Sequence, residues 1–500
     1  MNFCCVVFRL VCCFYLLTLV CLLNVFGQEQ VPRFESSACA VPLPKGENGQ
    51  CGYLVVAENR KIRSGRTIRL PVIILKSESA NSLPDPVLRT FGGPGASSLN
   101  LVNSRSASPW LKNRDLIIYE QRGTKYAQPA LDCPEVKETN INGAKQKLDA
   151  KTARVNEIQA AKICYDRLRN QGIDLSAYNS RESAADIEDL RRVLKLDKIN
   201  LWGLSYSSRL MLEVMRDYPD GIRSVILESP LPPEINYDEV GVDAIVRVFN
   251  VLFANCKANA GCAKAFPNLE NEFYDSYARL NKEPVTAEVK DSKTGETVKL
   301  NGKDFASWIV DYLFSNDAGA IGYAPLVIHD VFQNNYNAFK KYAREKTGAS
   351  STSLGMRYSF WCGEEFPFEN MRKIKAQSFL YPKFQGYEVM ALPDICGVWK
   401  VPAAKPVENK AVKSNIPTMV ITAEYDAYTP PAWGQAVAGR LKNSFLFEVP
   451  NVGHGPAFTT PCLGEMIKNF FDNPKSAPDS ECLKKIKSNT KFILEAPKAF

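Results

Sequence analysis

The sequence predicts an α/β fold, in which helices cover both faces of a mostly parallel sheet and a large helical segment interrupts it. Short apolar runs alternate with amphipathic stretches up to about residue 230, and the same rhythm resumes at Ile416. In between, helical patterns predominate. Strands that alternate with helices are typical of parallel sheets built from crossover units. A strand that runs directly into a small-residue turn and a helix at Ser205 indicates the same class.

The expected strands are apolar runs of strand length bounded by turn residues. Proline cannot donate to a ladder, so Pro71 suggests an edge position for its strand. Ser183 and Asp186 have the spacing of a capping box, which predicts a helix over 183–195 with Ile187 and Leu190 on its apolar face. In chain order, the strands are expected at 52–57, 67–75, 87–91, 116–119, 199–204, 225–227, 417–422 and 445–449.

The interruption has the properties of a cap inserted between the sixth and seventh core strands. Helical patterns are strongest at 242–253, 270–280 and 305–314. We therefore expect four parts along the chain. They are a signal peptide at 1–27, a first part of the core at 28–230, a helical cap at 231–415 and a C-terminal part of the core at 416–500.

The amino terminus resembles a secretion signal. Residues 1–27 carry one charge, Arg9, followed by an apolar run that ends at Val25-Phe26-Gly27. Such a run suits a cleaved signal peptide better than a membrane span, although an uncleaved anchor remains the alternative. Cleavage predicts a secreted or periplasmic protein that has no stable membrane association.

The cysteine count supports an oxidising compartment. Five of the fifteen cysteines lie within the expected signal, and an even number, ten, remains. Spacing cannot prove their connectivity, but pairing neighbours closes only short loops. There is no Cys-x-x-Cys and there are only two histidines, so a metal site is not expected. The neighbour pairs are Cys39–Cys51, Cys133–Cys164, Cys256–Cys262, Cys362–Cys396 and Cys462–Cys482.

The charge of the chain gives no sign of a nucleic-acid partner. The formal net charge is +8, and the lysines are scattered except near Lys484 to Lys491. A short basic tail of that kind is usually a solvated surface. We therefore expect no nucleic acid among the partners.

The turn at Ser205 has the pattern of a nucleophile elbow. Small residues at 203 and 207 flank the serine, and they allow a strained strand-to-helix turn with the hydroxyl exposed. Asp426 follows the strand expected at 417–422, and His454 lies between two glycines after the strand expected at 445–449. A serine, an acid and a histidine in this order and context predict a catalytic triad.

A serine hydroxyl needs a neighbouring base to act as a nucleophile, and the chain offers two candidates. His329 lies in an apolar helical stretch within the expected cap, which favours a structural role, whereas His454 lies in a glycine-flanked loop. Asp426 would orient the imidazole; Glu424 is a competitor that lies closer to the strand end.

Several segments resemble the proline iminopeptidases and tripeptidyl aminopeptidases, which are secreted serine exopeptidases of the α/β-hydrolase fold. The similarity covers most of the chain outside the cap. Departures from the family pattern are Ser207 for glycine, Glu120 for aspartate and Lys125 for glycine. The segments are 91–97 (Phe-Gly-Gly-Pro-Gly-Ala-Ser), 120–124 (Glu-Gln-Arg-Gly-Thr) with 129–133, 186–206, 426–430, 453–455 and the tail 462–482.

The resemblance also implies further site residues. An oxyanion needs backbone donors. The N–H of Tyr206, directly after the nucleophile, is one, and Gly93 is the second by resemblance. An exopeptidase must also recognise a free ammonium group, and the family tends to carry an acid after a cysteine in the cap. Glu364 and Glu365 follow Cys362, and they are therefore expected to bind the substrate.

Together these features predict a secreted serine hydrolase that needs no cofactor or metal. The leading hypothesis is an aminopeptidase that removes one to three residues from peptide N-termini through an acyl-enzyme on Ser205. A carboxylesterase or lactonase on the same fold is the alternative, because a fold does not fix the substrate. A catalytically inactive binding protein would require the loss of a triad member, and none is missing.

Overall fold

The computed structural model describes residues 30–62, 65–107, 112–146, 148–288, 297–315, 317–346, 352–384, 387, 393–487 and 491–495. The expected signal peptide, residues 1–27, lies outside the described residues. Within the described ranges, no helix has the length and apolar character needed to span a bilayer.

The core is a nine-stranded sheet with the order β1-β2-β3-β5-β4-β6-β7-β10-β11. The strands β1 to β3 and the β3–β5 pair are antiparallel, and every later pair is parallel. Counted from β2, the cap follows the sixth strand, so the predicted fold class is confirmed. The strands are Arg33–Ser36 (β1), Gly49–Ala57 (β2), Thr67–Leu75 (β3), Val87–Thr90 (β4), Leu116–Tyr119 (β5), Ile199–Leu204 (β6), Ile222–Glu228 (β7), Thr418–Ala423 (β10) and Ser444–Val449 (β11).

Both faces of the sheet are covered by helices, because successive strand residues point to opposite faces and almost all of them are apolar. In β6, for example, Leu201 packs in the hydrophobic cluster with α4, α5 and α15, while Trp202 packs on the other face with η1 and α16. These elements are Ser180–Val193 (α4), Tyr206–Asp217 (α5), Pro431–Ala438 (α15), the 3-10 helix Ser98–Ala107 (η1) and Pro461–Asp472 (α16).

Pro71 does not mark an edge strand, as the sequence suggested. β3 lies between β2 and β5, and its ladder with β5 begins at Val72. The carbonyl of Pro71 faces the same side and accepts a hydrogen bond of 2.9 Å from the N–H of Glu120. Because the β3–β5 ladder has already ended at this point, the missing donor of proline costs no strand pairing.

The capping box expected at Ser183 is also wrong. Helix α4 begins three residues earlier, and the Asn179 side chain caps it by accepting from the N–H of Glu182. Asp186 therefore lies inside the helix. Its buried carboxylate receives two hydrogen bonds from Arg122, of 2.7 and 2.8 Å, and one of 2.6 Å from Arg60. The arginine of the Arg-Gly-Thr segment thus has a structural partner.

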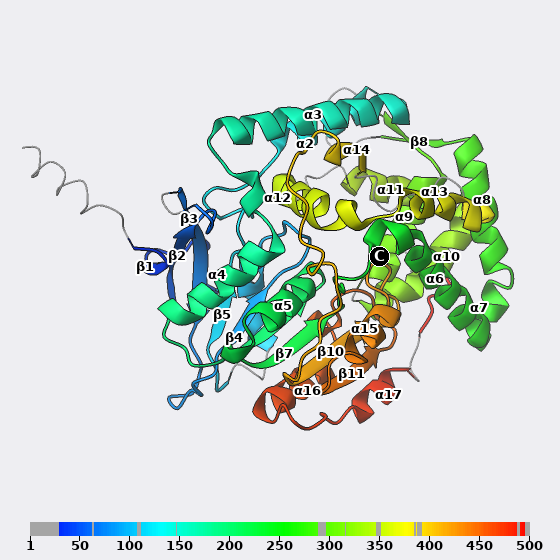
Figure 1. The fold of residues 1–500 in the computed structure, drawn as a ribbon. Coiled ribbons are helices and arrows are strands. Elements are labelled where there is room, and N and C mark those ends of the chain that lie inside the picture. Colours follow the sequence, from blue (N-terminus) through cyan, green and yellow to red (C-terminus); the bar gives the residue numbers. More distant parts are fainter. Residues whose placement is uncertain are drawn as a thin grey trace, which may run out of the picture.

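The cap has its own hydrophobic core, and its green-to-yellow helices lie together beside the sheet (Figure 1). The three expected cap helices lie within α6, α8 and α9, each of which is longer than the pattern predicted. A two-stranded sheet, β8 with β9, completes the cap. Its elements are Tyr237–Ala258 (α6), Ala260–Ala265 (α7), Leu269–Lys282 (α8), Val285–Glu288 (β8), Thr297–Leu300 (β9), Gly302–Phe314 (α9), Ala318–Phe332 (α10), Asn337–Lys346 (α11), Leu354–Phe360 (α12), the π-helix Trp361–Glu365, Met371–Leu380 (α13) and Pro393–Cys396 (α14).

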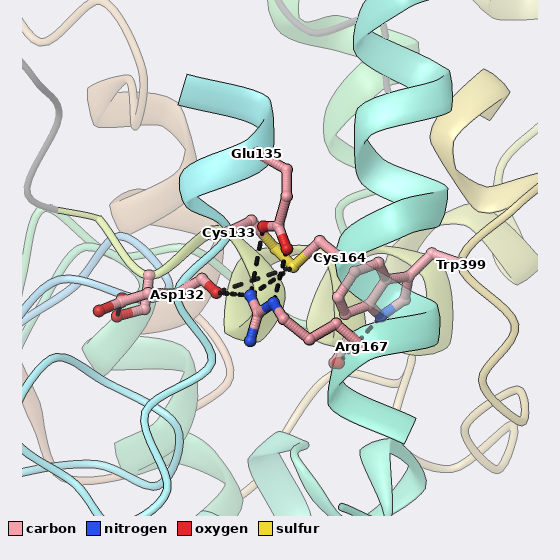
Figure 2. The surroundings of a disulfide bond; sticks show 8 residues. Asp132, Cys133, Glu135, Cys164, Arg167 and Trp399 are labelled. Atoms are coloured by element: carbon pink, nitrogen blue, oxygen red, sulfur yellow. Dashed lines mark hydrogen bonds and ion pairs between the residues drawn. A yellow bond between two sulfur atoms is a disulfide. The ribbon is translucent and has the colours of Figure 1, made fainter. Parts of the chain in front are cut away.

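All five neighbouring cysteine pairs form disulfide bonds. The bridge between Cys133 and Cys164 joins the start of α2 (Pro134–Lys145) to the middle of α3 (Ala150–Asn170). Figure 2 shows Arg167 of α3 beside this bridge, where its guanidinium donates to Glu135 at 2.5 Å and to the carbonyl of Asp132 at 2.8 Å. The two helices are therefore held together by a covalent bond and an ion pair.

Candidate active site

Ser205 lies at a strained turn between β6 and α5. Its backbone has φ 61° and ψ −130°, a region that residues other than glycine rarely occupy. Its N–H donates to the carbonyl of Glu228 at 2.9 Å, which fixes the turn to β7. Gly203 is required at this turn, because a Cβ there would lie 2.4 Å from the carbonyl oxygen of Ser207.

The serine at position 207, where the resembling family usually has glycine, fits the elbow through a polar contact. Its buried hydroxyl pairs with the Thr90 hydroxyl at the end of β4. The departure from the family pattern therefore adds a link between the elbow and the neighbouring strand.

His454 and Asp426 lie in direct contact. The Nδ1 atom of His454 is 2.8 Å from Oδ2 of Asp426, and the Thr429 hydroxyl donates to the same oxygen at 2.7 Å. The N–H of Thr429 donates to Oδ1 at 2.8 Å. Burial alone would raise the pKa of Asp426, but the charge of His454 and these hydrogen bonds outweigh burial and lower that pKa. The carboxylate is thus held ionised beside the imidazole.

The loop that carries His454, which we call the base loop after its expected role, is hydrogen-bonded to the end of a cap helix. The N–H groups of Gly453 and His454 donate to the carbonyls of Ser315 and Phe314 at 2.7 and 3.0 Å, at the end of α9. The Phe314 ring stacks on the imidazole, with a centroid distance of 4.7 Å and an interplanar angle of 18°. A Cβ at Gly453 would lie 2.3 Å from the carbonyl oxygen of Leu313, so only glycine allows this approach.

Ser205 and His454 open into one cavity of about 560 Å³ between the core and the cap. Within the described residues, no hydrogen bond joins the Ser205 hydroxyl to the imidazole; such contacts are commonly longer without substrate. The lining is mostly aromatic and apolar. It consists of Phe91, Gly92, Gly93, Ala96, Leu204, Ser205, Tyr206, Leu231, Tyr237, Asp311, Phe314, Arg357, Trp361, Tyr428, Thr429, His454 and Phe458.

The glycine loop after β4 also faces this cavity, so the structure brings Gly93 and Tyr206 together with Ser205. Gly93 has φ 118°, and a Cβ at Gly92 would lie 2.7 Å from the Cβ of Ser205. Both positions therefore require glycine, one for its backbone angle and the other for close approach. Among the hydrogen bonds of the described residues, none uses the N–H of Gly93 or of Tyr206, so both donors are available to an oxyanion.

Glu120 holds the far end of this loop. Its buried Oε2 accepts from the Ser97 hydroxyl at 3.0 Å and from the N–H groups of Ser98 and Leu99 at 2.8 and 3.2 Å. Burial raises its pKa, and these hydrogen bonds offset part of the rise. The glutamate that departs from the family pattern thus anchors the glycine loop after β4, whereas Lys125 is exposed over the ring of Tyr126.

The two competing residues lie away from the cavity. His329 is in α10, where its Nδ1 is 2.9 Å from a carboxylate oxygen of Glu272. Glu424 accepts from the side-chain amide of Asn255 at 3.0 Å and from the N–H of Asn451 at 2.9 Å. Neither lines the Ser205 cavity.

Glu364 and Glu365 do not line this cavity either, in contrast to the expectation that they bind substrate. The π-helix brings Trp361 to the cavity and buries both carboxylates on its other side, against Arg209 of α5. Glu364 accepts from the N–H of Ser180 at 2.6 Å. Burial raises the pKa values of Glu364 and Glu365 to about 7 and about 6, against the opposing effect of Arg209. The contacts of Glu364 and Glu365 with Arg209 therefore link the cap to the core.

Two charged residues of the cavity were missed by sequence reasoning. Asp311 lies in α9 one turn before Phe314, where it accepts from the hydroxyl of Tyr342, and Arg357 lies in α12. Neither belongs to a recognisable motif. Asp311 could have been found from helical periodicity only with knowledge of which face of α9 covers the base loop.

Comparison with known proteins gives consistent similarities. Residues 382–482 match a family model described as TAP-like protein. The chain is 23% identical to serine protease Hip1 of Mycobacterium tuberculosis over 448 residues, 82% of each chain. It is 21% identical to a tripeptidyl aminopeptidase of Streptomyces coelicolor, over 84% of this chain and 80% of the relative. A carboxylesterase B of M. tuberculosis is also 21% identical, over 85% and 87%.

Proposed function

We propose that this serine hydrolase, which is similar to the TAP-like α/β-hydrolases, is an exported aminopeptidase. The observation that carries the proposal is the joint presence of Ser205, the His454–Asp426 pair and a cap carboxylate, Asp311, around one cavity. The relatives named as a protease and a tripeptidyl aminopeptidase support a peptide substrate. Five disulfide bonds support export, because such bonds persist in oxidising compartments.

The proposed mechanism begins with the attack of Ser205 Oγ on the scissile carbonyl. Asp426 holds Nδ1 of His454, which leaves Nε2 to take the serine proton. The N–H groups of Gly93 and Tyr206 stabilise the oxyanion. His454 then protonates the leaving amine, and a water molecule, activated by the same imidazole, hydrolyses the acyl-enzyme on Ser205.

Asp311 is the proposed partner of the substrate's ammonium group, in place of Glu364 and Glu365. It comes from the helix that also carries Phe314, and it lines the same cavity as His454 on the side of the cap. A charge-assisted contact between a carboxylate and an ammonium contributes about 1.5–3 kcal/mol. This corresponds to roughly a tenfold to hundredfold preference for a free N-terminus over a blocked one.

The test uses anilides of one, two and three residues, with free or acetylated N-termini, beside a short acyl ester. Ser205→Ala should abolish all hydrolysis and phosphonate labelling. Asp311→Asn should raise KM for free peptides by about tenfold to a hundredfold and leave the ester unaffected. Asp275→Asn, an exposed acid of α8 in the same cap, is the matched control and should change nothing.

The alternative is an esterase, which the similarity to carboxylesterase B favours. Equal rates on free and acetylated peptides, or hydrolysis of the ester alone, would contradict the aminopeptidase proposal and leave the esterase ahead.

A further inference from the structure

A short stretch of the cap, residues 353–355, packs against the loop after β4 that carries Gly93, which we call the oxyanion loop. The N–H of Ser353 donates to the carbonyl of Gly95 at 2.9 Å, and the N–H of Gly355 donates to the carbonyl of Leu131 at 2.8 Å. The approach is too close for side chains. A Cβ at Gly95 would lie 2.6 Å from the Ser353 carbonyl oxygen, and one at Gly355 would lie 2.6 Å from the Leu131 carbonyl oxygen. Residues 353–355 therefore bridge the oxyanion loop and the segment before Cys133.

The Ser353 hydroxyl does not cap the helix that begins after it. Ser353 is the N-cap residue of α12, where a serine side chain normally accepts from the first turn of its helix. No such hydrogen bond is formed. The buried hydroxyl donates instead to Oδ1 of Asp132 at 2.6 Å. The Ser353 hydroxyl thus connects the cap domain to the core and leaves the N-terminus of α12 without a side-chain cap.

Asp132 is itself held in place from behind. The next residue, Cys133, is joined to Cys164 of α3, and Arg167 of the same helix donates to the Asp132 carbonyl at 2.8 Å (Figure 2). The Asp132 backbone is thus fixed by a covalent bond and a charge-assisted hydrogen bond. Because the Asp132 side chain accepts from the Ser353 hydroxyl, and the Ser353 N–H donates to the Gly95 carbonyl, a fixed Asp132 backbone also restrains Gly95.

The two supports act on opposite ends of the same loop. Glu120 fixes residues 97–99, and Ser353 fixes Gly95, two residues after Gly93. Pro94 lies between Gly93 and Gly95, and its ring restricts the backbone of this short connection. A displacement of Gly95 would therefore move the N–H of Gly93.

We propose that Asp132 is a positioning residue for the oxyanion hole, acting through the Ser353 hydroxyl and the Gly95 carbonyl. The proposal rests on the oxyanion role proposed above for Gly93, and it holds for a peptide and an ester substrate alike. Loss of the contact leaves the triad intact and misplaces one donor. A misplacement of about 1 Å costs on the order of a hundredfold in rate, and complete loss of a donor costs about 10²–10³.

The experiment compares Asp132→Ala, Ser353→Ala and the conservative Asp132→Asn, which keeps the Oδ1 acceptor. Both alanine variants should lower kcat on an acyl ester by about tenfold to a hundredfold, with KM within about twofold. Affinity for a trifluoromethyl ketone, which forms a tetrahedral adduct on Ser205, should fall by the same factor as kcat. Affinity for the carboxylic acid product should not change, and Asp132→Asn should stay within about threefold of the wild-type kcat.

Asp149→Ala is the matched control. Asp149 caps α3 at its exposed end, so its loss destabilises the same helix without touching Ser353. It should lower the melting temperature and leave kcat unchanged.

Two outcomes overturn the proposal. One is a folded Asp132→Ala with wild-type kcat; the other is a loss of kcat in which ketone affinity is kept, which would indicate a purely structural role. If Asp132→Ala does not fold, Ser353→Ala decides by the same ratio. Failure of the proposed function is seen separately, because the wild-type enzyme would then hydrolyse free and acetylated peptides at equal rates, or the ester alone, while the effects of the variants on the ester would remain.

Discussion

Gly453→Ala should separate the catalytic base from its cap support while leaving the sheet intact. The added Cβ would lie 2.3 Å from the Leu313 carbonyl oxygen and 2.5 Å from the carbonyl carbon and oxygen of Phe314. Normal contacts between carbon and oxygen start near 3.3 Å, so the base loop must retreat by about 1 Å. A displacement of this size in a catalytic group costs on the order of a hundredfold in kcat.

The assay is hydrolysis of an acyl ester together with the rate of phosphonate labelling, both measured beside thermal unfolding. Labelling and kcat should fall together, because both need the base near Ser205. Gly439→Ala is the matched control: this glycine follows α15 with φ −64°, and a Cβ there would meet its nearest atom at 3.4 Å. A Gly453→Ala enzyme with wild-type kcat would refute the idea that the cap positions the imidazole.

Two further predictions concern titratable residues. His454→Ala should lower kcat by several orders of magnitude, whereas His329→Ala should lower only stability, because its Nδ1 is bound to Glu272; an essential His329 would show that the base loop is misassigned. Burial raises the pKa of Glu364 to about 7, so the folded chain binds its proton more tightly than the unfolded chain. This contribution is complete below about pH 4.5 and is lost as the pH rises through 7, on the order of 3 kcal/mol. Urea unfolding of Glu364→Gln should accordingly depend less on pH between 5 and 8 than that of the wild type, and equal slopes would contradict the shift.

Most of the core could be predicted from the sequence, because the residue patterns that indicate its strands and turns are local. The strand, turn and helix around Ser205 lie within twenty residues, and the loops of Asp426 and His454 each follow an apolar strand directly. The apolar patterns therefore predicted eight of the nine strands of the sheet, all except β1, and the resemblance identified the fold.

The cap and the buried charges were predicted less well because their partners are distant in sequence. Asp186 looked like a capping residue because nothing local shows that Arg122 will bind it. Glu364 and Glu365 matched a motif, but the π-helix that turns them toward Arg209 has no sequence signature. The role of an acid in the cap depends on which way its helix faces, and only the tertiary structure gives that.

The disulfide bond between Cys133 and Cys164 connects the activity of the chain to the redox conditions in which it folds. Its neighbour Asp132 supports, as proposed above, the loop that carries Gly93, whereas the contact between Asp426 and His454 involves no cysteine. In a reducing solution the Asp132 backbone would lose its covalent connection to α3 and keep the hydrogen bond from Arg167. On the proposal above, a reduced chain would be a weaker hydrolase than the oxidised one. On the same proposal, forming this disulfide after synthesis would raise the activity of the folded chain.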